Sequence, residues 1–167
     1  MSSTEHKAQG PVRVRAFVVT VSDTRTKDTD TAGTAIVDLL AAAGHQVVGT
    51  AIEKDDPAQV AHLVRQQALS QAVDVIITTG GTGITRRDST FEAVDSLLEK
   101  KLPGFGELFR MLSFQEIGSA AMMSRACAGT LGGVVVIALP GSESAVRLAM
   151  TTLVLPELGH LVQQASK

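Results

Sequence analysis

Short apolar runs alternate with segments of helical periodicity along this chain, and this alternation limits the possible folds most strongly. Residues 12–21, 46–52, 73–78 and 134–139 are apolar runs rich in β-branched residues. The near-continuous apolar run of residues 12–21 is typical of a strand buried on both faces of a sheet, residues 73–78 indicate a short buried strand, and residues 46–52 and 134–139 indicate two further strands. Strands that alternate with helices indicate an α/β fold with a parallel sheet and right-handed crossovers.

The intervening segments predict the helices. Over residues 32–43 the apolar positions recur every three or four residues, and Gly44 follows as a stop signal. Further helices are expected near residues 60–68, 91–98 and 105–112, with one or two closing helices over residues 144–164. Residues 125–130 could pair antiparallel with the last strand across a turn at Gly132 and Gly133.

Length and composition predict one soluble domain. The 167 residues suit a single domain over residues 11–167, preceded by a polar, disordered tail over residues 1–10 that lacks the apolar core of a secretory signal. No apolar run approaches the length of about 18 residues that a membrane span needs. The single cysteine, Cys127, cannot form an intrachain disulfide, which fits a reducing, cytoplasmic location.

Charge and aromatic content argue against nucleic acid as a partner. The formal net charge is −2, and lysine and arginine are scattered along the chain rather than grouped. With no tryptophan, no tyrosine and five phenylalanines, the chain also lacks the side chains for a base-stacking platform. We therefore expect a small-molecule site rather than a nucleic-acid surface.

The strongest chemical signal is a glycine-rich loop, Thr79-Gly80-Gly81-Thr82-Gly83, which directly follows a buried strand. Glycines at this position let successive backbone N–H groups face a phosphate, although a tight strand-to-helix turn would explain them too. Neither the Walker A pattern nor the Rossmann G-x-G-x-x-G spacing is present. In parallel sheets ligands gather at the carboxyl ends of strands, where Ser22-Asp23-Thr24-Arg25, residues 79–88 and Pro140-Gly141-Ser142 are expected to meet.

Two aspartates are the candidate metal ligands. Asp88 follows Arg86-Arg87 just after the glycine loop, and its capping role is not needed because Ser89 and Glu92 form a capping-box pattern. In Lys54-Asp55-Asp56-Pro57, Asp56 suits the helix N-cap before proline, which leaves Asp55 without a structural duty. Two carboxylates with substrate phosphates suit Mg²⁺, although oxygen ligands would accept Mn²⁺ too.

The remaining segments are ambiguous by themselves. Pro103-Gly104-Phe105-Gly106-Glu107 could be only a helix entry, and Ser124-Arg125 could lie in an ordinary loop. The four histidines have no metal-ligand spacing, and the methionines at 111, 122 and 123 suit packing or a subunit contact.

Five blocks, in order and spanning most of the chain, together resemble the MoaB/MogA family. They are Thr20-Val21-Ser22-Asp23-Thr24-Arg25, Gly80-Gly81-Thr82-Gly83 with Arg87-Asp88, Thr90 and Glu92-Ala93, Pro103-Gly104-Phe105-Gly106-Glu107, Ser124-Arg125, and Leu139-Pro140-Gly141. The resemblance extends to the molybdopterin-adenylating domains of gephyrin-like proteins. It implies a three-layer α/β/α sandwich around a five-stranded, mostly parallel sheet with one antiparallel strand.

The resemblance also implies an activity, in which the terminal phosphate of molybdopterin attacks the α-phosphorus of Mg-ATP and pyrophosphate leaves. Asp55 and Asp88 match the acidic positions associated with metal and catalysis. The candidate binding residues are Ser22, Thr79, Gly80, Gly81, Thr82, Gly83, Arg87, Gly104, Phe105, Gly106, Glu107, Ser124, Arg125, Pro140, Gly141 and Ser142.

The segment Gly106–Gly118 looks like the MoaB branch, in which some members resemble pterin binders without good adenylyltransferase activity. Because both carboxylates are present, we expect an active adenylyltransferase. The alternative is a non-catalytic molybdopterin-binding or scaffold protein, whereas a generic NTPase or kinase lacks its motifs here. The resemblance further implies a homotrimer or homohexamer, and contact with other cofactor-assembly proteins is a further expectation.

Overall fold

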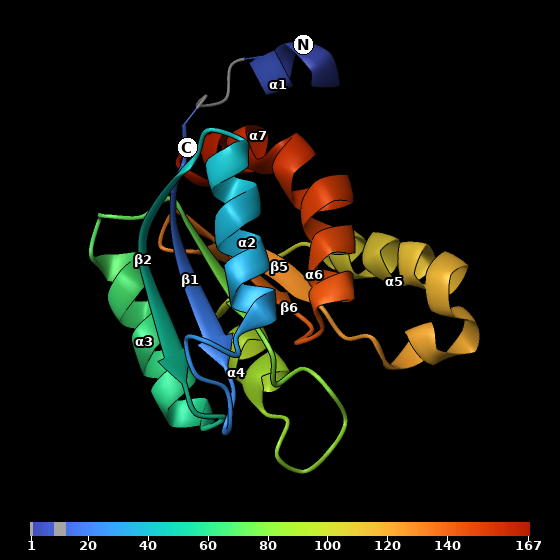
Figure 1. Cartoon of the computed structure of the whole chain (residues 1–167). Coiled ribbons are helices and arrows are strands. Elements are labelled where there is room, and N and C mark those ends of the chain that lie inside the picture. Colours follow the sequence, from blue (N-terminus) through green and yellow to red (C-terminus); the bar gives the residue numbers. More distant parts are fainter. Residues whose placement is uncertain (1, 9–12) are drawn as a thin grey trace.

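The computed structural model describes residues 2–8 and 13–167, and a six-stranded sheet forms its central layer (Figure 1). The strands are β1 (Arg15–Val21), β2 (Gln46–Glu53), β3 (Val75–Thr79), β4 (Lys100–Lys101), β5 (Cys127–Leu131) and β6 (Val134–Leu139). Their order is β2-β1-β3-β6-β5-β4. The first four of these are parallel, β5 is antiparallel to β6, and β4 is antiparallel to β5.

Helices cover both faces of the sheet, which confirms the predicted three-layer α/β/α sandwich (Figure 1). They are α1 (Ser3–Ala8), α2 (Thr31–Ala42), α3 (Pro57–Leu69), α4 (Thr90–Leu97), α5 (Pro103–Ile117), η1 (Gly118–Met123), α6 (Glu143–Ala149), η2 (Met150–Val154) and α7 (Leu155–Ala165). Side chains of α2, α6 and α7 share one apolar cluster with the sheet, and those of α3 and α4 share the cluster on the other face.

The start of α3 is positioned by the local signal that the sequence predicts. Asp56 accepts hydrogen bonds from the amides of Ala58 and Gln59, both at 3.0 Å, and Pro57 begins α3. Asp30 caps α2 in the same way through the amide of Gly33. Each cap satisfies donors that a helix leaves unpaired in its first turn.

The sheet has one strand more than the five that the sequence predicts. The additional strand, β4, contains only Lys100 and Lys101, which are exposed and pair with Thr130 and Gly129 of β5. Two exposed lysines carry no apolar pattern, so pairing with β5 alone makes this segment a strand. The first strand begins at Arg15 rather than at residue 12, which lies outside the described residues.

The N-terminal segment also differs from its prediction. Where a disordered tail is expected over residues 1–10, the structure describes helix α1 near α7. Residues 1, 9 and 10 of that predicted tail lie outside the described residues. A capping interaction between Ser2 and Glu5 accompanies the helix, because the Glu5 amide donates to Ser2 Oγ and the Ser2 amide donates to the Glu5 carboxylate.

The closing helices form one continuous helical segment, Glu143–Ala165, with a π-helical turn at η2. Pro156 lacks an N–H donor, and the widened turn directly precedes it. By length and composition this segment could cross a membrane, which the sequence interpretation did not anticipate. Its inward residues Val146, Met150 and Leu158 are fully buried in the core cluster of the α2 face.

Successive strands are added on opposite sides of β1, although β1, β2 and β3 are all parallel. From β1 the chain crosses to β2 at one edge, and it then returns to β3 on the other side of β1. The carboxyl ends of β1 and β3 therefore flank the topological switch point, where open α/β sheets leave a crevice for ligands. The loops that begin at Ser22 and at Gly80 leave the sheet at this point.

Candidate functional site

The glycine loop is held tightly against its neighbours at the carboxyl edge of the sheet. Gly80 and Gly81 have positive φ angles of +99° and +69°, and a Cβ on Gly80 would lie 2.2 Å from the Val21 carbonyl oxygen. The Gly80 amide donates to the Leu139 carbonyl, and Thr79 Oγ1 donates to the Pro140 carbonyl at 2.7 Å. The predicted meeting of the loops after β1, β3 and β6 is therefore confirmed.

Three successive carbonyl oxygens of the glycine loop, those of Gly81, Thr82 and Gly83, accept hydrogen bonds. The Gly81 carbonyl accepts from the amides of Thr90 and Phe91 at the start of α4. Arg125 donates to the Thr82 carbonyl from Nε at 2.8 Å and to the Gly83 carbonyl from Nη2 at 2.5 Å. Among the described residues, the amides that follow these carbonyls, those of Thr82, Gly83 and Ile84, donate no hydrogen bond.

Arg125 is surrounded by groups that fix its orientation. Its Nη1 also donates to the Glu92 carboxylate, and its guanidinium lies 4.7 Å from the centre of the Phe91 ring. Hydrogen bonding to Arg125 lowers the pKa of Glu92. Sequence reasoning proposed Arg125 as a substrate ligand, but its donors serve the glycine loop and Glu92. From the sequence, Glu92 was expected only to cap a helix, and Phe91 only to lie on one face of that helix.

Asp55 has a structural role that the sequence interpretation denied it. Its Oδ1 accepts from the Ser89 amide at 3.2 Å and from Ser89 Oγ at 2.7 Å. The predicted Ser89–Glu92 capping box is wrong, because Ser89 makes no side-chain cap bond and Glu92 pairs with Arg125. Asp55 Oδ2 lies beside the glycine loop, 2.9 Å from where a Cβ on Gly81 would be.

Asp88 closes the far end of the same loop. Its Oδ2 accepts from the Thr85 amide at 2.9 Å and from Thr85 Oγ1 at 2.6 Å. A Cβ on Gly83 would lie 2.5 Å from this oxygen and 3.4 Å from Oδ1. Glycine at 83 therefore gives the carboxylate room beside the backbone. Both predicted carboxylates flank the loop, one near Gly81 and the other near Gly83.

A third carboxylate joins the loops after β1 and β3. Asp23 Oδ2 accepts from Arg87 Nη2 at 2.7 Å and from Nε at 3.1 Å, and Asp23 Oδ1 accepts from the Asp55 amide. The Arg87 hydrogen bond, followed by that from the Asp55 amide, lowers the pKa of Asp23. Arg87 is thus paired with protein, whereas the neighbouring Arg86 is exposed and forms no ion pair within the described part of the chain.

The carboxylate oxygens around the glycine loop suit a metal ion only if a bound phosphate supplies further ligands. Residues 2–8 and 13–167 contain no cluster of three or more His, Cys, Asp or Glu side chains that could hold an ion. Asp55 Oδ2 and Asp88 Oδ1 accept no hydrogen bond from the described residues and remain as oxygen donors. Two such oxygens fit Mg²⁺, which is usually held by one or two carboxylates plus substrate phosphates.

Several predicted site residues have structural explanations. Ser22 Oγ accepts from the amides of Thr24 and Arg25, and Ser142 Oγ caps α6 through the Ala145 amide. Within the described part of the chain, the side chains of residues 104–107 and 124 form no hydrogen bond with the glycine loop. Phe105 packs against the core, Gly106 lies against the Ala126 carbonyl, Glu107 is exposed, Gly104 has open space around it, and Ser124 makes no side-chain hydrogen bond among the described residues.

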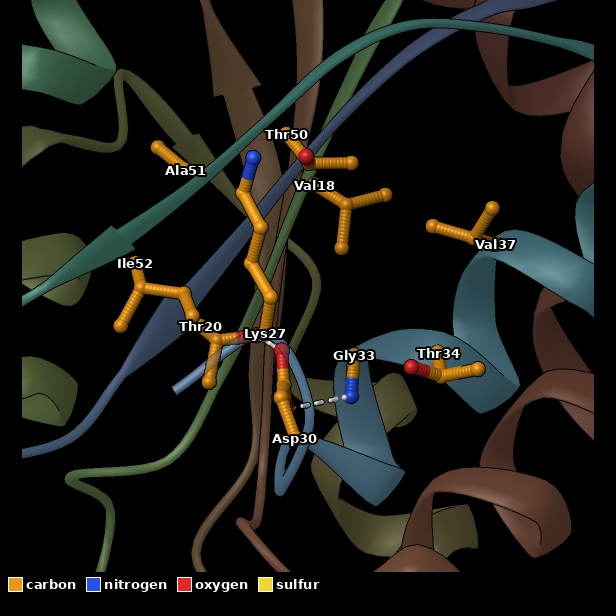
Figure 2. Close-up of a pocket in the computed structure, with 10 residues that line it drawn as sticks. All are labelled: Val18, Thr20, Lys27, Asp30, Gly33, Thr34, Val37, Thr50, Ala51 and Ile52. Carbon is orange, nitrogen blue, oxygen red and sulfur yellow. Dashed lines mark hydrogen bonds between the residues drawn. The ribbon is translucent and has the colours of Figure 1, made fainter. Parts of the chain in front are cut away.

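Among the cavities outside the glycine loop, two are relevant to the predicted site. One, of about 340 Å³, is lined by Gly106, Glu107, Phe91 and the buried Cys127, whose pKa is raised to about 12 by burial. The other, of about 310 Å³, lies between α2 and the β1–β2 edge and contains none of the predicted site residues (Figure 2). Its buried carboxylate, Asp30, already accepts from Thr20 Oγ1 and the Gly33 amide.

Comparison with known proteins identifies the family of the chain. Residues 17–160 match the family described as "Probable molybdopterin binding domain". The chain belongs to this family. It is 54% identical over 162 residues to molybdenum cofactor biosynthesis protein B of Bacillus cereus, covering 96% of each chain.

Solved structures extend the similarity to the fold. A crystal structure of a molybdenum cofactor biosynthesis protein B superimposes with a TM-score of 0.90 at 52% identity, covering 94% of this chain and 98% of that one. The tungsten cofactor synthesizing protein MoaB from Pyrococcus furiosus gives a TM-score of 0.84 at 36% identity, covering 94% and 99%. The resemblance to the MoaB/MogA family is confirmed, and these relatives carry names of the MoaB branch.

Proposed function

We propose that this protein acts in molybdenum cofactor biosynthesis as a molybdopterin adenylyltransferase. In this reaction a phosphate oxygen of molybdopterin forms a bond to the α-phosphorus of ATP. The bond between that phosphorus and the oxygen bridging to the β-phosphorus breaks, and its electron pair leaves with pyrophosphate. The products are adenylated molybdopterin and pyrophosphate.

The observation that carries this proposal is the row of unpaired amides at Thr82, Gly83 and Ile84, with carboxylates at both ends. Adjacent backbone N–H groups in a glycine-rich turn form a concave site for an anion. Phosphoryl-type transfer depends mainly on positioning and on neutralising charge, so it needs no nucleophilic side chain from the protein. The family match supports molybdopterin as the substrate that carries the attacking phosphate.

The two carboxylates are the proposed metal-binding groups. Asp55 Oδ2 and Asp88 Oδ1 would hold Mg²⁺ jointly with the phosphates of ATP, where the ion would neutralise charge on the leaving pyrophosphate. Asp55 is also hydrogen-bonded to Ser89 and Asp88 to Thr85, so both carboxylates are oriented before any ligand arrives. Arg86, which is exposed in the same loop, is a further candidate partner for phosphate.

A non-catalytic molybdopterin-binding protein is the alternative function. Its structural support is that both aspartates already accept hydrogen bonds from their own surroundings, so loop stabilisation alone would explain their presence. The two functions differ in what the carboxylates contribute: an enzyme needs their charge during turnover, whereas a binding protein needs only the shape of the loop.

Substitution of Asp88 by asparagine separates the two functions. Asparagine keeps an oxygen that accepts from Thr85 but removes the negative charge. We expect product formation from molybdopterin, Mg²⁺ and ATP to fall by a factor of at least about 100, because metal-held charge matters most as the α-phosphate reacts. Molybdopterin binding should change by less than about tenfold.

Asp56→Asn provides the matched control, because Asp56 caps α3 and asparagine is an equally good cap. Turnover in this control should remain close to that of the unchanged protein. If Asp88→Asn lowered binding and turnover by the same factor, a structural role for Asp88 and the alternative function would be favoured.

We further propose that the protein is a cytoplasmic homo-oligomer, a trimer or hexamer. Helix α5 and η1 expose a set of large apolar side chains that the single chain leaves uncovered: Leu108, Met111, Phe114, Ile117, Met122 and Met123. Burial of such a patch against further copies would remove apolar surface from water. Contact with other cofactor-assembly proteins is a second use for the same patch.

A further inference from the structure

We infer that Arg125 is a positioning residue that locks the peptide planes of the glycine loop so that the amides, and not the carbonyls, face the phosphate. Glu92 and Phe91 hold Arg125 in the required orientation. This inference rests on the proposed phosphate-binding role of the loop. It replaces the prediction that Arg125 itself contacts the substrate.

The argument begins with the geometry of the peptide bond. In a trans peptide the C=O of one residue and the N–H of the next point in opposite directions across a common plane. Arg125 fixes the C=O groups of Thr82 and Gly83 by direct hydrogen bonds. The N–H groups of Gly83 and Ile84 are therefore directed away from Arg125. The Gly81 carbonyl, held by the start of α4, directs the Thr82 amide in the same way.

In a glycine-rich loop the orientation of the peptide planes has to be fixed by other groups. Glycine adopts positive and negative φ angles almost equally well, so a peptide plane next to a glycine can rotate at little cost. A rotated plane would present a carbonyl oxygen to the phosphate, and that contact is repulsive. Fixing the carbonyls in advance removes this alternative before the anion binds, which is the basis of preorganised electrostatic binding.

The surroundings of Arg125 select arginine over lysine. The planar guanidinium spans the two neighbouring carbonyls through Nε and Nη2 while Nη1 reaches Glu92, a pattern that a single ammonium group cannot reproduce. One face of the guanidinium lies over the Phe91 ring. Only 25% of the Arg125 side chain is exposed, so solvent competes weakly for these hydrogen bonds.

Two readouts test the role of Arg125. Pyrophosphate with Mg²⁺ is the binding probe, measured by calorimetry, and ¹⁵N relaxation reports the order of the backbone at residues 82–84 without any ligand. In Arg125→Gln we expect about 10- to 100-fold weaker pyrophosphate binding, as for loss of charge-assisted hydrogen bonds. The order parameters of residues 82–84 should fall from the rigid value of about 0.85 towards about 0.6.

Conservative variants distinguish positioning from direct contact. Arg125→Lys keeps the charge but loses the planar guanidinium that spans two carbonyls. Its glycine loop should therefore be as mobile as that of Arg125→Gln, and its pyrophosphate affinity should be reduced. Glu92→Gln and Phe91→Leu should produce smaller losses of both quantities, and they keep the test possible if Arg125→Gln does not fold. In Arg125→Ala, millimolar guanidinium should restore part of the pyrophosphate binding.

Arg15→Gln is the matched control. Arg15 also donates to a carboxylate, that of Asp74, and to a backbone carbonyl, that of Gln71, but it lies at the opposite end of the sheet. This control should leave loop order and pyrophosphate affinity unchanged even if it lowers stability.

Three results would overturn the inference: unchanged binding and order in Arg125→Gln, weaker binding with an ordered loop, or equal losses in Arg15→Gln. The inference and the proposed function can fail separately. If the unchanged protein made no adenylated pterin while the Arg125 variants still lost loop order, only the proposed function would be wrong.

Discussion

Alanine at Gly80 should destabilise the protein through two separable effects. The φ angle of +99° is unfavourable for alanine and costs about 1–3 kcal/mol. The new Cβ would also lie 2.2 Å from the Val21 carbonyl oxygen, a backbone atom at the end of β1, where Val21 is paired with Glu53 of β2. Overpacking of this kind costs about 1–3 kcal/mol more, for a total of about 4 kcal/mol.

Gly44→Ala isolates the first effect. Gly44 has a similar φ of +85°, but nothing lies within 4 Å of its Cβ position, so only the backbone cost of about 1–2 kcal/mol applies. Thermal unfolding by circular dichroism should show Tm reduced by roughly 8–16 °C in Gly80→Ala and by roughly 2–8 °C in Gly44→Ala. Equal losses in the two variants would show that the close approach of the glycine loop to β1 contributes nothing.

Two further predictions follow from other parts of the chain. Burial lowers the pKa of His45, and its Nδ1 accepts a hydrogen bond from the Val14 amide. Neutral His45 therefore stabilises the folded protein fully above pH about 6.5, the pKa of a free histidine. This stabilisation is lost as the pH falls through the lower pKa of His45 in the folded protein. Urea unfolding of His45→Asn should therefore depend less on pH in this window than that of the unchanged protein, and identical pH profiles would contradict this. Phe114→Glu should reduce oligomer size in sedimentation experiments, whereas Leu69→Glu, at an even more exposed apolar position on α3, should not. A smaller oligomer in both variants, or in neither, would exclude a specific α5 interface.

Local sequence patterns were sufficient for most of the architecture. β3 and β6 are buried on both faces and therefore appear as apolar runs. Asp56 as N-cap and Pro57 as the first helical residue mark the start of α3 as predicted. β4 could not be predicted in this way, because Lys100 and Lys101 become a strand only through their partners in β5. The pattern of a strand is weak when it is short and exposed.

The site was predictable in its position but not in its internal contacts. The glycine loop and Asp88 are adjacent in sequence, so their proximity follows from the chain itself. The capping-box pattern at Ser89 and Glu92 failed because distant residues, Asp55 and Arg125, take those side chains instead. Partners more than 30 residues apart in the chain, such as these, leave no local pattern in a single sequence.

The proposed function is tested most directly by the fate of the α-phosphate of ATP. The purified protein is incubated with molybdopterin, Mg²⁺ and ATP labelled at the α-phosphorus, and the products are separated. We predict that the label appears on the pterin and that pyrophosphate is released in equal amount. Label that stays in ATP at saturating molybdopterin, although molybdopterin is bound, would contradict adenylyl transfer and would leave a pterin-binding protein.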